Sequence, residues 1–134
     1  ANSSLAANIG YLGVPTSIFT KGEITPFDKR KIDVHTLITA RMLKDSAVLD
    51  LDSEILMYHH ENIDGSGYPR GLKGEEIPLG ARAMRIVDAF NAMTSPRLYR
   101  FQMEPKDALR ELFSMSGKML DPDMTSLYVD LIGF

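Results

Sequence analysis

The sequence predicts an all-α fold, and three observations support this prediction. No stretch of its 134 residues alternates apolar and polar side chains with the period of two that a half-buried strand requires. Apolar residues instead recur at three- and four-residue spacing, which places them on one face of a helix. Three prolines also stand where helices are expected to begin: Pro26, which follows the capping residue Thr25, and then Pro105 and Pro122.

Composition limits the size and class of the protein. With 44% hydrophobic residues, a chain of 134 residues can build one domain around a single core, and 1–134 is interpreted as one domain. The net charge of −3 and the lack of a Lys/Arg-rich run exclude a nucleic-acid footprint at the level of the whole chain. Without cysteine, a metal site must use His, Asp, Glu or carbonyl oxygen. No apolar run approaches the roughly 20 residues of a membrane span, so we expect a soluble, cytoplasmic protein.

The first residues predict a short helix. Ser3 or Ser4 is expected to cap it, and Gly10 to lie near its end. A helix of two turns with Leu5 and Ile9 as its apolar side buries little surface. We therefore expect more protein to precede it in the natural gene product, which would make the domain partial.

Thr25, Pro26 and Asp28 have the order of a helix start, with Thr as N-cap, Pro at the first helical position and a carboxylate at the third. The apolar spacing that follows predicts one helix to about Lys44. His35 lies on its apolar stripe. From the residues alone it is either a hydrogen-bonded core histidine or a metal ligand.

The next helix is expected to begin near Asp52, as its cap, and to end in His59-His60. Adjacent helical residues diverge by about 100°. The pair therefore suits a multi-metal pocket, in which the two rings flank one centre or serve two, better than chelation of one atom. In the alternative, one histidine caps the helix C-terminus and the other packs in the core. The loop 62–80 is long and rich in turn residues, so we expect it to be ordered.

Residues 81–94 form the most apolar predicted helix, which we expect to be the central one. Asp88 lies in the middle of it. A carboxylate that is taken out of water without a partner is strongly destabilising. Asp88 is therefore expected to be metal-bound, strongly hydrogen-bonded, or ion-paired with Arg82 or Arg85.

Two arginines follow this helix, with Tyr99 between them. Arg97 and Arg100 either hold a phosphate through forked guanidinium geometry or are solvated surface residues. The last two predicted helices, from Pro105 to about Met115 and from Pro122 onward, are interpreted as structural. Their expected inward residues are Leu109, Leu112, Phe113, Leu127, Val129 and Leu131.

Several motifs together resemble one family. They are His59-His60-Glu61, Asp64-Gly65-Ser66-Gly67-Tyr68-Pro69, Gly71-Leu72-Lys73-Gly74, Ile77-Pro78, the stretch from Val87 to Ser95, and Tyr99-Arg100. From Ala7 on, the chain is similar to the HD-GYP domain, a branch of the HD superfamily of metal-dependent phosphohydrolases that comprises bacterial cyclic-di-GMP phosphodiesterases. The resemblance implies an HD-superfamily-like helical bundle, here N-terminally truncated, with a long ordered GYP loop.

The resemblance also implies roles for individual residues. The implied metal ligands are His35, His59, His60 and Asp88. Three imidazoles and a carboxylate suit Fe, Mn or Zn better than Mg. Tyr68, with its neighbours Gly67 and Pro69, would line the dinucleotide pocket, while Arg97 and Arg100 would face the phosphates.

The sequence departs from the family at its N-terminal end. Where the family has His-Asp followed three residues later by Lys, this chain has Ala7, Asn8 and Tyr11. Ala offers no ligand, and the neutral Asn cannot be the carboxylate that bridges two cations. Tyr cannot supply the ammonium that would offset charge on the phosphate. We interpret the chain as a degenerate member without an intact catalytic set, and we expect the metal to be partly bound or absent.

Two functional hypotheses follow. The favoured one is a catalytically impaired signalling module that serves an upstream sensor or receiver domain. It would bind cyclic-di-GMP, or a partner such as a diguanylate cyclase through the Gly67-Tyr68-Pro69 surface. The alternative is an active or weakly active metal-dependent cyclic-di-GMP phosphodiesterase. We also expect a homodimer, because apolar surface that upstream helices would cover tends to be met by another chain.

Overall fold

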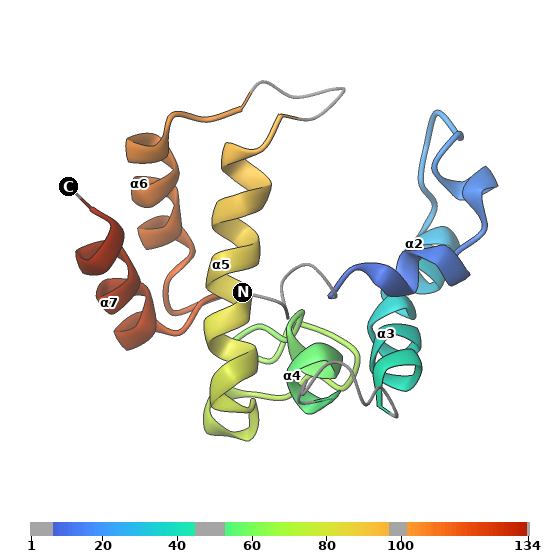
Figure 1. Cartoon of the computed structure of the whole chain (residues 1–134), viewed down its shortest axis with the longest axis horizontal. Coiled ribbons are helices and arrows are strands. Elements are labelled where there is room, and N and C mark those ends of the chain that lie inside the picture. The colour runs from blue at the N-terminus through green and yellow to red at the C-terminus, as the bar shows by residue number, and fades with distance from the viewer. Residues whose placement is uncertain (1–6, 45–52, 97–101, 134) are drawn as a thin grey trace.

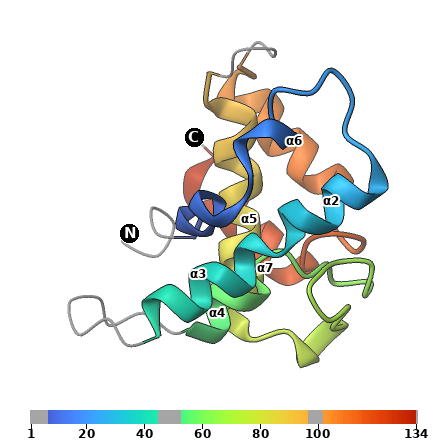
Figure 2. The ribbon, with the colours of Figure 1, turned by 90° about the vertical axis from the view of Figure 1, so that its right-hand side faces the viewer.

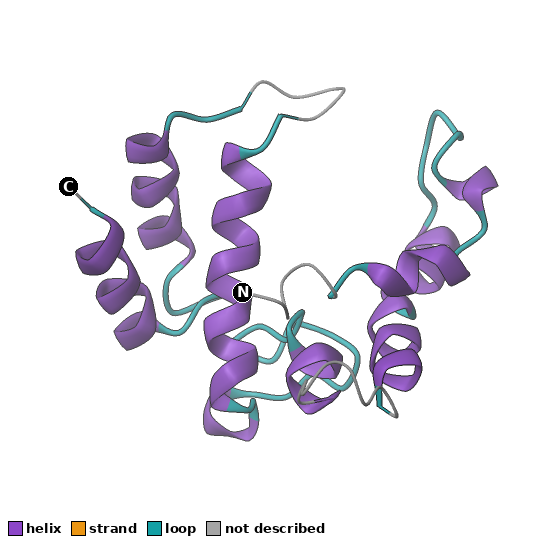
Figure 3. Ribbon diagram, in the orientation of Figure 1, coloured by secondary structure: helices purple, strands orange, loops and turns teal. Residues whose placement is uncertain are grey.

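The computed structural model describes residues 7–44, 53–96 and 102–133, which are helical and contain no strand beyond an isolated bridge between Ser116 and Leu120 (Figures 1 and 3). The all-α prediction is confirmed. In chain order the elements are the 3₁₀ helices η1 (Ile9–Gly13) and η2 (Thr16–Ile18), the α-helices α2 (Pro26–Asp33), α3 (His35–Leu43) and α4 (Ser53–Tyr58), the 3₁₀ helix η3 (Gly74–Glu76), and α5 (Leu79–Thr94), α6 (Pro105–Met115) and α7 (Pro122–Ile132). None of the helices in these three ranges is long and apolar enough to cross a membrane.

Helix α5 is the central element, as predicted. It packs against α6 and α7 on one side and against α4 on the other (Figure 1). Buried Ile86, Ala89 and Met93 of α5 meet Ala108 and Leu112 of α6 in the largest apolar cluster. This cluster holds the C-terminal helices to α5, and it leaves the other side of α5 for the candidate site.

The segment around η1 packs closely on α3. The Gly10 amide donates to Thr39 Oγ1 at 2.9 Å, and the Thr39 hydroxyl donates to the carbonyl of Ala7 at 3.0 Å. A Cβ atom at Gly10 would collide with the His35 carbonyl oxygen and with Thr39. Only glycine therefore allows η1 to lie this near to α3.

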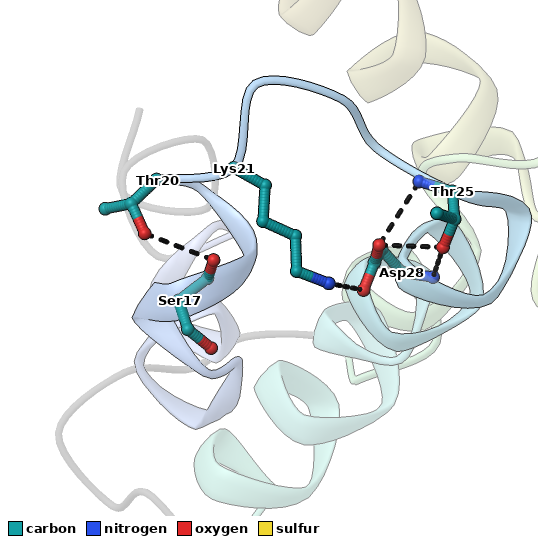
Figure 4. A network of polar contacts seen from close by, with 5 residues as sticks. All are labelled: Ser17, Thr20, Lys21, Thr25 and Asp28. Atoms are coloured by element: carbon teal, nitrogen blue, oxygen red, sulfur yellow. Dashed lines mark hydrogen bonds and ion pairs between the residues drawn. The ribbon is translucent and has the colours of Figure 1, made fainter.

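The helix predicted from Pro26 to Lys44 is two helices, so the single-helix prediction is wrong. Its N-terminus is as predicted, because Thr25 and Asp28 form a capping box (Figure 4). Val34 separates the two helices, as the C-cap of α2 and the N-cap of α3, and α2 and α3 follow each other across the face of the molecule in front of α5 (Figure 2). The His35 ring nitrogen Nδ1 lies 2.8 Å from the Ile32 carbonyl oxygen, an acceptor that a continuous helix would keep for its own backbone.

Other helix boundaries also differ from the predictions. Gly10 lies inside η1 rather than at a helix end, and the predicted caps at Ser3 or Ser4 fall outside the described residues. Helix α4 ends at Tyr58, one residue before the histidine pair, and its predicted cap Asp52 is likewise outside the described part of the chain.

The last two helices begin at Pro105 and Pro122 as predicted, and Asp121 caps α7. Their inward faces were predicted only in part. Leu112 is fully buried, and Leu109 and Val129 pack against the core, whereas three residues predicted to face inward are exposed. These are Phe113, Leu127 and Leu131, with exposed fractions of 51%, 60% and 74%.

Candidate metal centre

Three histidines, one at the start of α3 and two directly after α4, lie close together. His35 opens α3, and His59 and His60 follow the last residue of α4. Each offers one ring nitrogen, and the three nitrogens lie within 4.8 Å of one another. His35 and His59 are fully buried, and His60 is half-buried. The structure thus brings together three of the four predicted ligand positions, although their role toward a metal remains a prediction.

Hydrogen bonds fix the proton on two of the rings. His35 Nδ1 lies 2.8 Å from the carbonyl oxygen of Ile32, and His59 Nδ1 lies 2.7 Å from that of Leu56. A carbonyl oxygen only accepts, so Nδ1 is the donor in both rings and Nε2 carries the lone pair. Both Nε2 atoms are buried without a hydrogen-bond partner among the described residues. This is the arrangement of metal-binding histidines, whose other nitrogen is held by a hydrogen bond.

Burial keeps these rings neutral. It lowers the pKa of His35 and of His59, although hydrogen bonds to backbone carbonyls and the negative charge of Asp88 oppose the shift. Burial, reinforced by His59 and by the positive charge of Arg85, lowers the pKa of His60 to about 2. At neutral pH all three are therefore free imidazoles, the form that binds a divalent metal.

His60 differs from the other two histidines in its hydrogen bond. Arg85 Nη1 donates to His60 Nδ1 at 3.3 Å, and Arg85 Nη2 donates to the Asn62 side-chain oxygen at 3.1 Å. A guanidinium has no acceptor, so His60 Nδ1 accepts and the proton of the neutral ring lies on Nε2. The Nε2 atoms of His35 and His59 can therefore bind a metal as they are. His60 Nε2 could do so only if its proton were transferred to Nδ1. From the sequence, Arg85 was considered only as a possible ion-pair partner of Asp88.

Asp88 lies on α5, half-buried, outside the group of three histidines. Of the alternatives left open for Asp88, an ion pair with Arg82 does not form, because Arg82 binds Asp121 at 2.7 Å. No ion pair joins Asp88 to Arg85 in the described part of the chain either. The charge of Asp88 nevertheless affects the pKa values of His35 and His59, which places it near the site. A metal role for Asp88 remains a prediction.

The three positions at which the sequence departs from the family, Ala7, Asn8 and Tyr11, lie in η1 or just before it. Ala7 is buried against Leu56 and Met84 in a small apolar cluster, and Asn8 is exposed. The Tyr11 ring stacks on the His35 ring, with centroids 4.0 Å apart and an angle of 11°. Of these positions, the phenol ring of Tyr11 is the group in contact with a histidine of the site.

The loop after the histidines is organised by a buried carboxylate. Glu61 accepts hydrogen bonds from the amides of Arg70 at 2.7 Å and Leu72 at 3.0 Å, so the loop is held to the end of α4. Sequence reasoning did not identify this role; the signal was an acidic residue directly before a loop rich in backbone donors.

The loop carries the predicted pocket residues to the histidines. The Tyr68 ring stacks on His60, with centroids 5.0 Å apart, and burial raises the pKa of its hydroxyl. A Cβ atom at Gly67 would collide with the backbone of residues 61 and 62, and Pro69 follows Tyr68 in the same turn. The two other predicted pocket residues, Arg97 and Arg100, lie outside the described residues.

Comparisons with known proteins agree on one family. A family profile described as HD domain matches residues 1–124. A protein of Thermotoga maritima named cyclic di-GMP phosphodiesterase is 40% identical over 92% of this chain and 34% of its own length. The cyclic di-GMP phosphodiesterase response regulator RpfG of Xanthomonas campestris is 35% identical over 86% of this chain and 31% of its own length. The chain thus spans about a third of the curated relatives it matches.

A solved structure shares the fold. It is the crystal structure of a cyclic GMP-AMP specific phosphodiesterase of Vibrio cholerae, with a TM-score of 0.67 and 19% identity. The match covers 96% of this chain and 36% of that one. At this identity the similarity establishes the helical fold, and the chemistry has to be argued from the site.

Proposed function

The chain belongs to the HD domain family, in agreement with its resemblance to the HD-GYP branch, and on that premise we propose that it is a catalytically impaired module that binds cyclic-di-GMP. Its relatives are named cyclic di-GMP phosphodiesterases, which supports this ligand. The impairment is supported by the residues at the start of the described chain.

One observation carries the proposal: the two sides of the candidate site differ in chemistry. On one side His35, His59 and His60 bring three ring nitrogens together. On the other side Ala7 is an apolar core residue and Asn8 is an exposed neutral amide. Hydrolysis that depends on a carboxylate at position 8 and an ammonium at position 11 lacks both groups, because these residues are Asn8 and Tyr11.

The donor set fits a divalent metal. His35 and His59 present buried Nε2 lone pairs, and His60 would join them once its proton lies on Nδ1. Three imidazoles favour Fe, Mn or Zn, with Asp88 as a further ligand. When bound, such a metal would neutralise charge on a phosphate oxygen. We propose one ion per chain, because Ala7 and Asn8 provide nothing to hold a second.

The ligand would lie on the loop side of the histidines. Tyr68 presents its ring beside His60, and Gly67 and Pro69 shape the turn that carries it. For Arg97 and Arg100, which lie outside the described residues, we propose from the family resemblance that they bind the phosphates.

The first test combines metal analysis with a hydrolysis assay. We expect at most one equivalent of metal and no detectable turnover to the linear dinucleotide. A variant that combines Ala7→His, Asn8→Asp and Tyr11→Lys should hydrolyse at least about 100-fold faster, because it regains charge stabilisation at the phosphate. Adding His59→Ala to this variant is the matched control and should abolish the gain. Two equivalents of metal with rapid turnover in the unaltered chain would reject the impairment.

The second test is calorimetry of the unaltered chain with cyclic-di-GMP. Saturable binding supports the proposal. No detectable binding would reject the nucleotide and leave a docking function, in which a partner such as a diguanylate cyclase contacts the Gly67-Tyr68-Pro69 surface.

The alternative function is an active or weakly active phosphodiesterase. The names of the relatives favour it, and so do the three retained histidines. It requires that hydrolysis proceed without the groups missing at Ala7, Asn8 and Tyr11. Turnover that is lost in His59→Ala would establish this function.

A further inference from the structure

Helix α5 carries two arginines almost one turn apart, and they differ in their partners. The Arg82 guanidinium is neutralised by Asp121, with Nη1 and Oδ2 2.7 Å apart. Arg85 has no carboxylate within ion-pair distance among the described residues. Its two Nη groups donate to neutral acceptors, His60 Nδ1 and the Asn62 side-chain oxygen. Its Nε is buried without a hydrogen-bond partner in the same part of the chain.

A half-buried cation without a paired anion is unfavourable. Asp88 lies three residues further along the same helix but forms no ion pair with Arg85 in the described part of the chain. Removing one partner of a buried ion pair is strongly destabilising, because it leaves an uncompensated charge. Among the described residues Arg85 has no ion-pair partner, so an anion that reached it would gain a charge-assisted, forked hydrogen bond.

The surroundings of Arg85 are partly open to solvent. Arg85, His60, Asn62 and Tyr68 are each half-buried, so solvent reaches part of this group. The Tyr68 ring lies against His60, the same residue that Arg85 contacts. A ligand on the Tyr68 loop would therefore have its polar groups close to the guanidinium.

Building on the proposed function, we propose that Arg85 binds a phosphate oxygen of the ligand and supplies from α5 the positive charge that Tyr11 does not supply. The ligand class is a phosphodiester or free phosphate. Arg85 Nη1 would then donate to the phosphate oxygen instead of to His60 Nδ1. Arg85 Nη2 would keep its hydrogen bond to the Asn62 side-chain oxygen.

The hydrogen bond to His60 links this role to metal binding. His60 can offer Nε2 to a metal only when its proton lies on Nδ1, and Nδ1–H cannot accept from Arg85. Metal binding through His60 would therefore release Arg85 Nη1, which then requires another acceptor. A phosphate oxygen is the acceptor that this release favours, so metal and phosphate should each increase the affinity for the other.

The experiment compares Arg85→Gln and Arg85→Lys with Arg110→Gln. Arg110 is a matched control because it is exposed and pairs with Asp107 on the surface. Calorimetry with cyclic-di-GMP should show at least about tenfold weaker binding for Arg85→Gln, the loss expected for one charged hydrogen bond. Arg85→Lys should be intermediate, because it keeps the charge and loses the fork. Arg110→Gln should bind like the unaltered chain.

Thermal unfolding supplies a readout that a merely structural arginine would not give. Without ligand or metal, Arg85→Gln should unfold at the same or a higher temperature than the unaltered chain, because it removes an unpaired buried charge. Inorganic phosphate should raise the unfolding temperature of the unaltered chain and of Arg110→Gln, but not that of Arg85→Gln. If Arg85→Gln unfolds at a clearly lower temperature or fails to fold, Arg85 is structural and the inference is overturned.

The outcomes separate this inference from the proposed function. If cyclic-di-GMP binds the unaltered chain and Arg85→Gln equally well, the inference is overturned and the proposed function stands. If cyclic-di-GMP does not bind but phosphate stabilises the chain only through Arg85, the inference stands and the nucleotide is rejected. If neither cyclic-di-GMP nor phosphate binds the unaltered chain, both are overturned.

Discussion

The two sides of the candidate site, one formed by α3 and α4 and the other by η1, are packed against each other but carry different functional groups. On the side of α3 and α4, three buried or half-buried histidines converge, and two of them have Nε2 lone pairs without a partner among the described residues. On the side of η1, the chain packs just as closely, with Gly10 against α3 and Ala7 in an apolar cluster. That side offers an exposed amide at Asn8 and a stacked phenol at Tyr11.

This difference shows that the packing of η1 does not depend on catalytic groups. Its position is fixed by Gly10, Thr39 and the carbonyl of Ala7, which are a glycine, a hydroxyl and a backbone atom. A chain can therefore keep the fold of an HD domain while the side chains next to these contacts change. Membership of the family therefore indicates the fold, whereas catalytic activity depends on the side chains at the site.

The largest expected effect comes from the histidine side. His59→Ala removes a buried lone pair, and we expect metal affinity to fall by more than about 100-fold, since even the partners that orient a ligand contribute 10–100-fold. Metal content after dialysis measures this. His60→Ala should lose less, because the His60 ring is held by Arg85 in the other tautomer. Equal metal retention in His59→Ala and the unaltered chain would show that this side is not a metal site.

The next effect tests the scaffold role of η1. Gly10→Ala places a methyl group against the His35 carbonyl and Thr39, and we expect a loss of about 1–3 kcal/mol in the free energy of unfolding, as for other overpacked positions. Denaturant unfolding measures it. Gly22→Ala is the matched control, because nothing lies within 4 Å of its added Cβ. Identical stability of the two variants would mean that η1 is not packed on α3.

A smaller effect is expected from the loop that joins the histidines to Tyr68. Glu61→Gln weakens two charge-assisted hydrogen bonds, and we expect about 1–2 kcal/mol of destabilisation together with faster amide exchange at Arg70 and Leu72. Glu76→Gln is the control, because Glu76 is exposed and accepts from a single amide, that of Lys73. Unchanged exchange at both amides in Glu61→Gln would contradict the role given to this carboxylate.

The smallest effect lies away from the site and depends on pH. The Lys21 side chain, with help from Thr25, lowers the pKa of Asp28 to about 2 from an ordinary value of 3.8 (Figure 4). A folded-state pKa below the unfolded one stabilises the fold above about pH 4, and this contribution is lost as the pH falls from about 4 to about 2. Asp28→Asn should flatten the stability curve in that window. A curve of unchanged slope would contradict the assignment.

Local signals in the sequence predicted the scaffold well. The capping box at Thr25, the helix starts at Pro105 and Pro122 and the central place of α5 depend on neighbouring residues or on a strong apolar pattern. The break at Val34 was missed because the apolar spacing continues through it, whereas the His35 ring contacts the Ile32 carbonyl, which a continuous helix would have used. Leu127 and Leu131 were misplaced because the inward face of a helix depends on its neighbours, which spacing does not reveal.

The site was predictable in its residue types and less so in its contacts. The paired histidines, the glycine-rich loop, and His35 and Asp88 on apolar helices are visible in the sequence, and the resemblance favoured a metal role for His35 and Asp88 among the alternatives. The roles of Glu61 and Arg85 were not visible, because both depend on groups brought together by folding: loop amides for Glu61, and a histidine and an amide oxygen for Arg85. The partner of Arg82, 39 residues away, was missed for the same reason.

The contrast between the two sides is tested most directly by one assay on the unaltered protein, in which bound metal is counted and hydrolysis of cyclic-di-GMP is followed in the same sample. The account predicts no more than one ion per chain, retained by the histidines, and no conversion of the dinucleotide. Two firmly bound ions together with fast conversion to the linear product would contradict it.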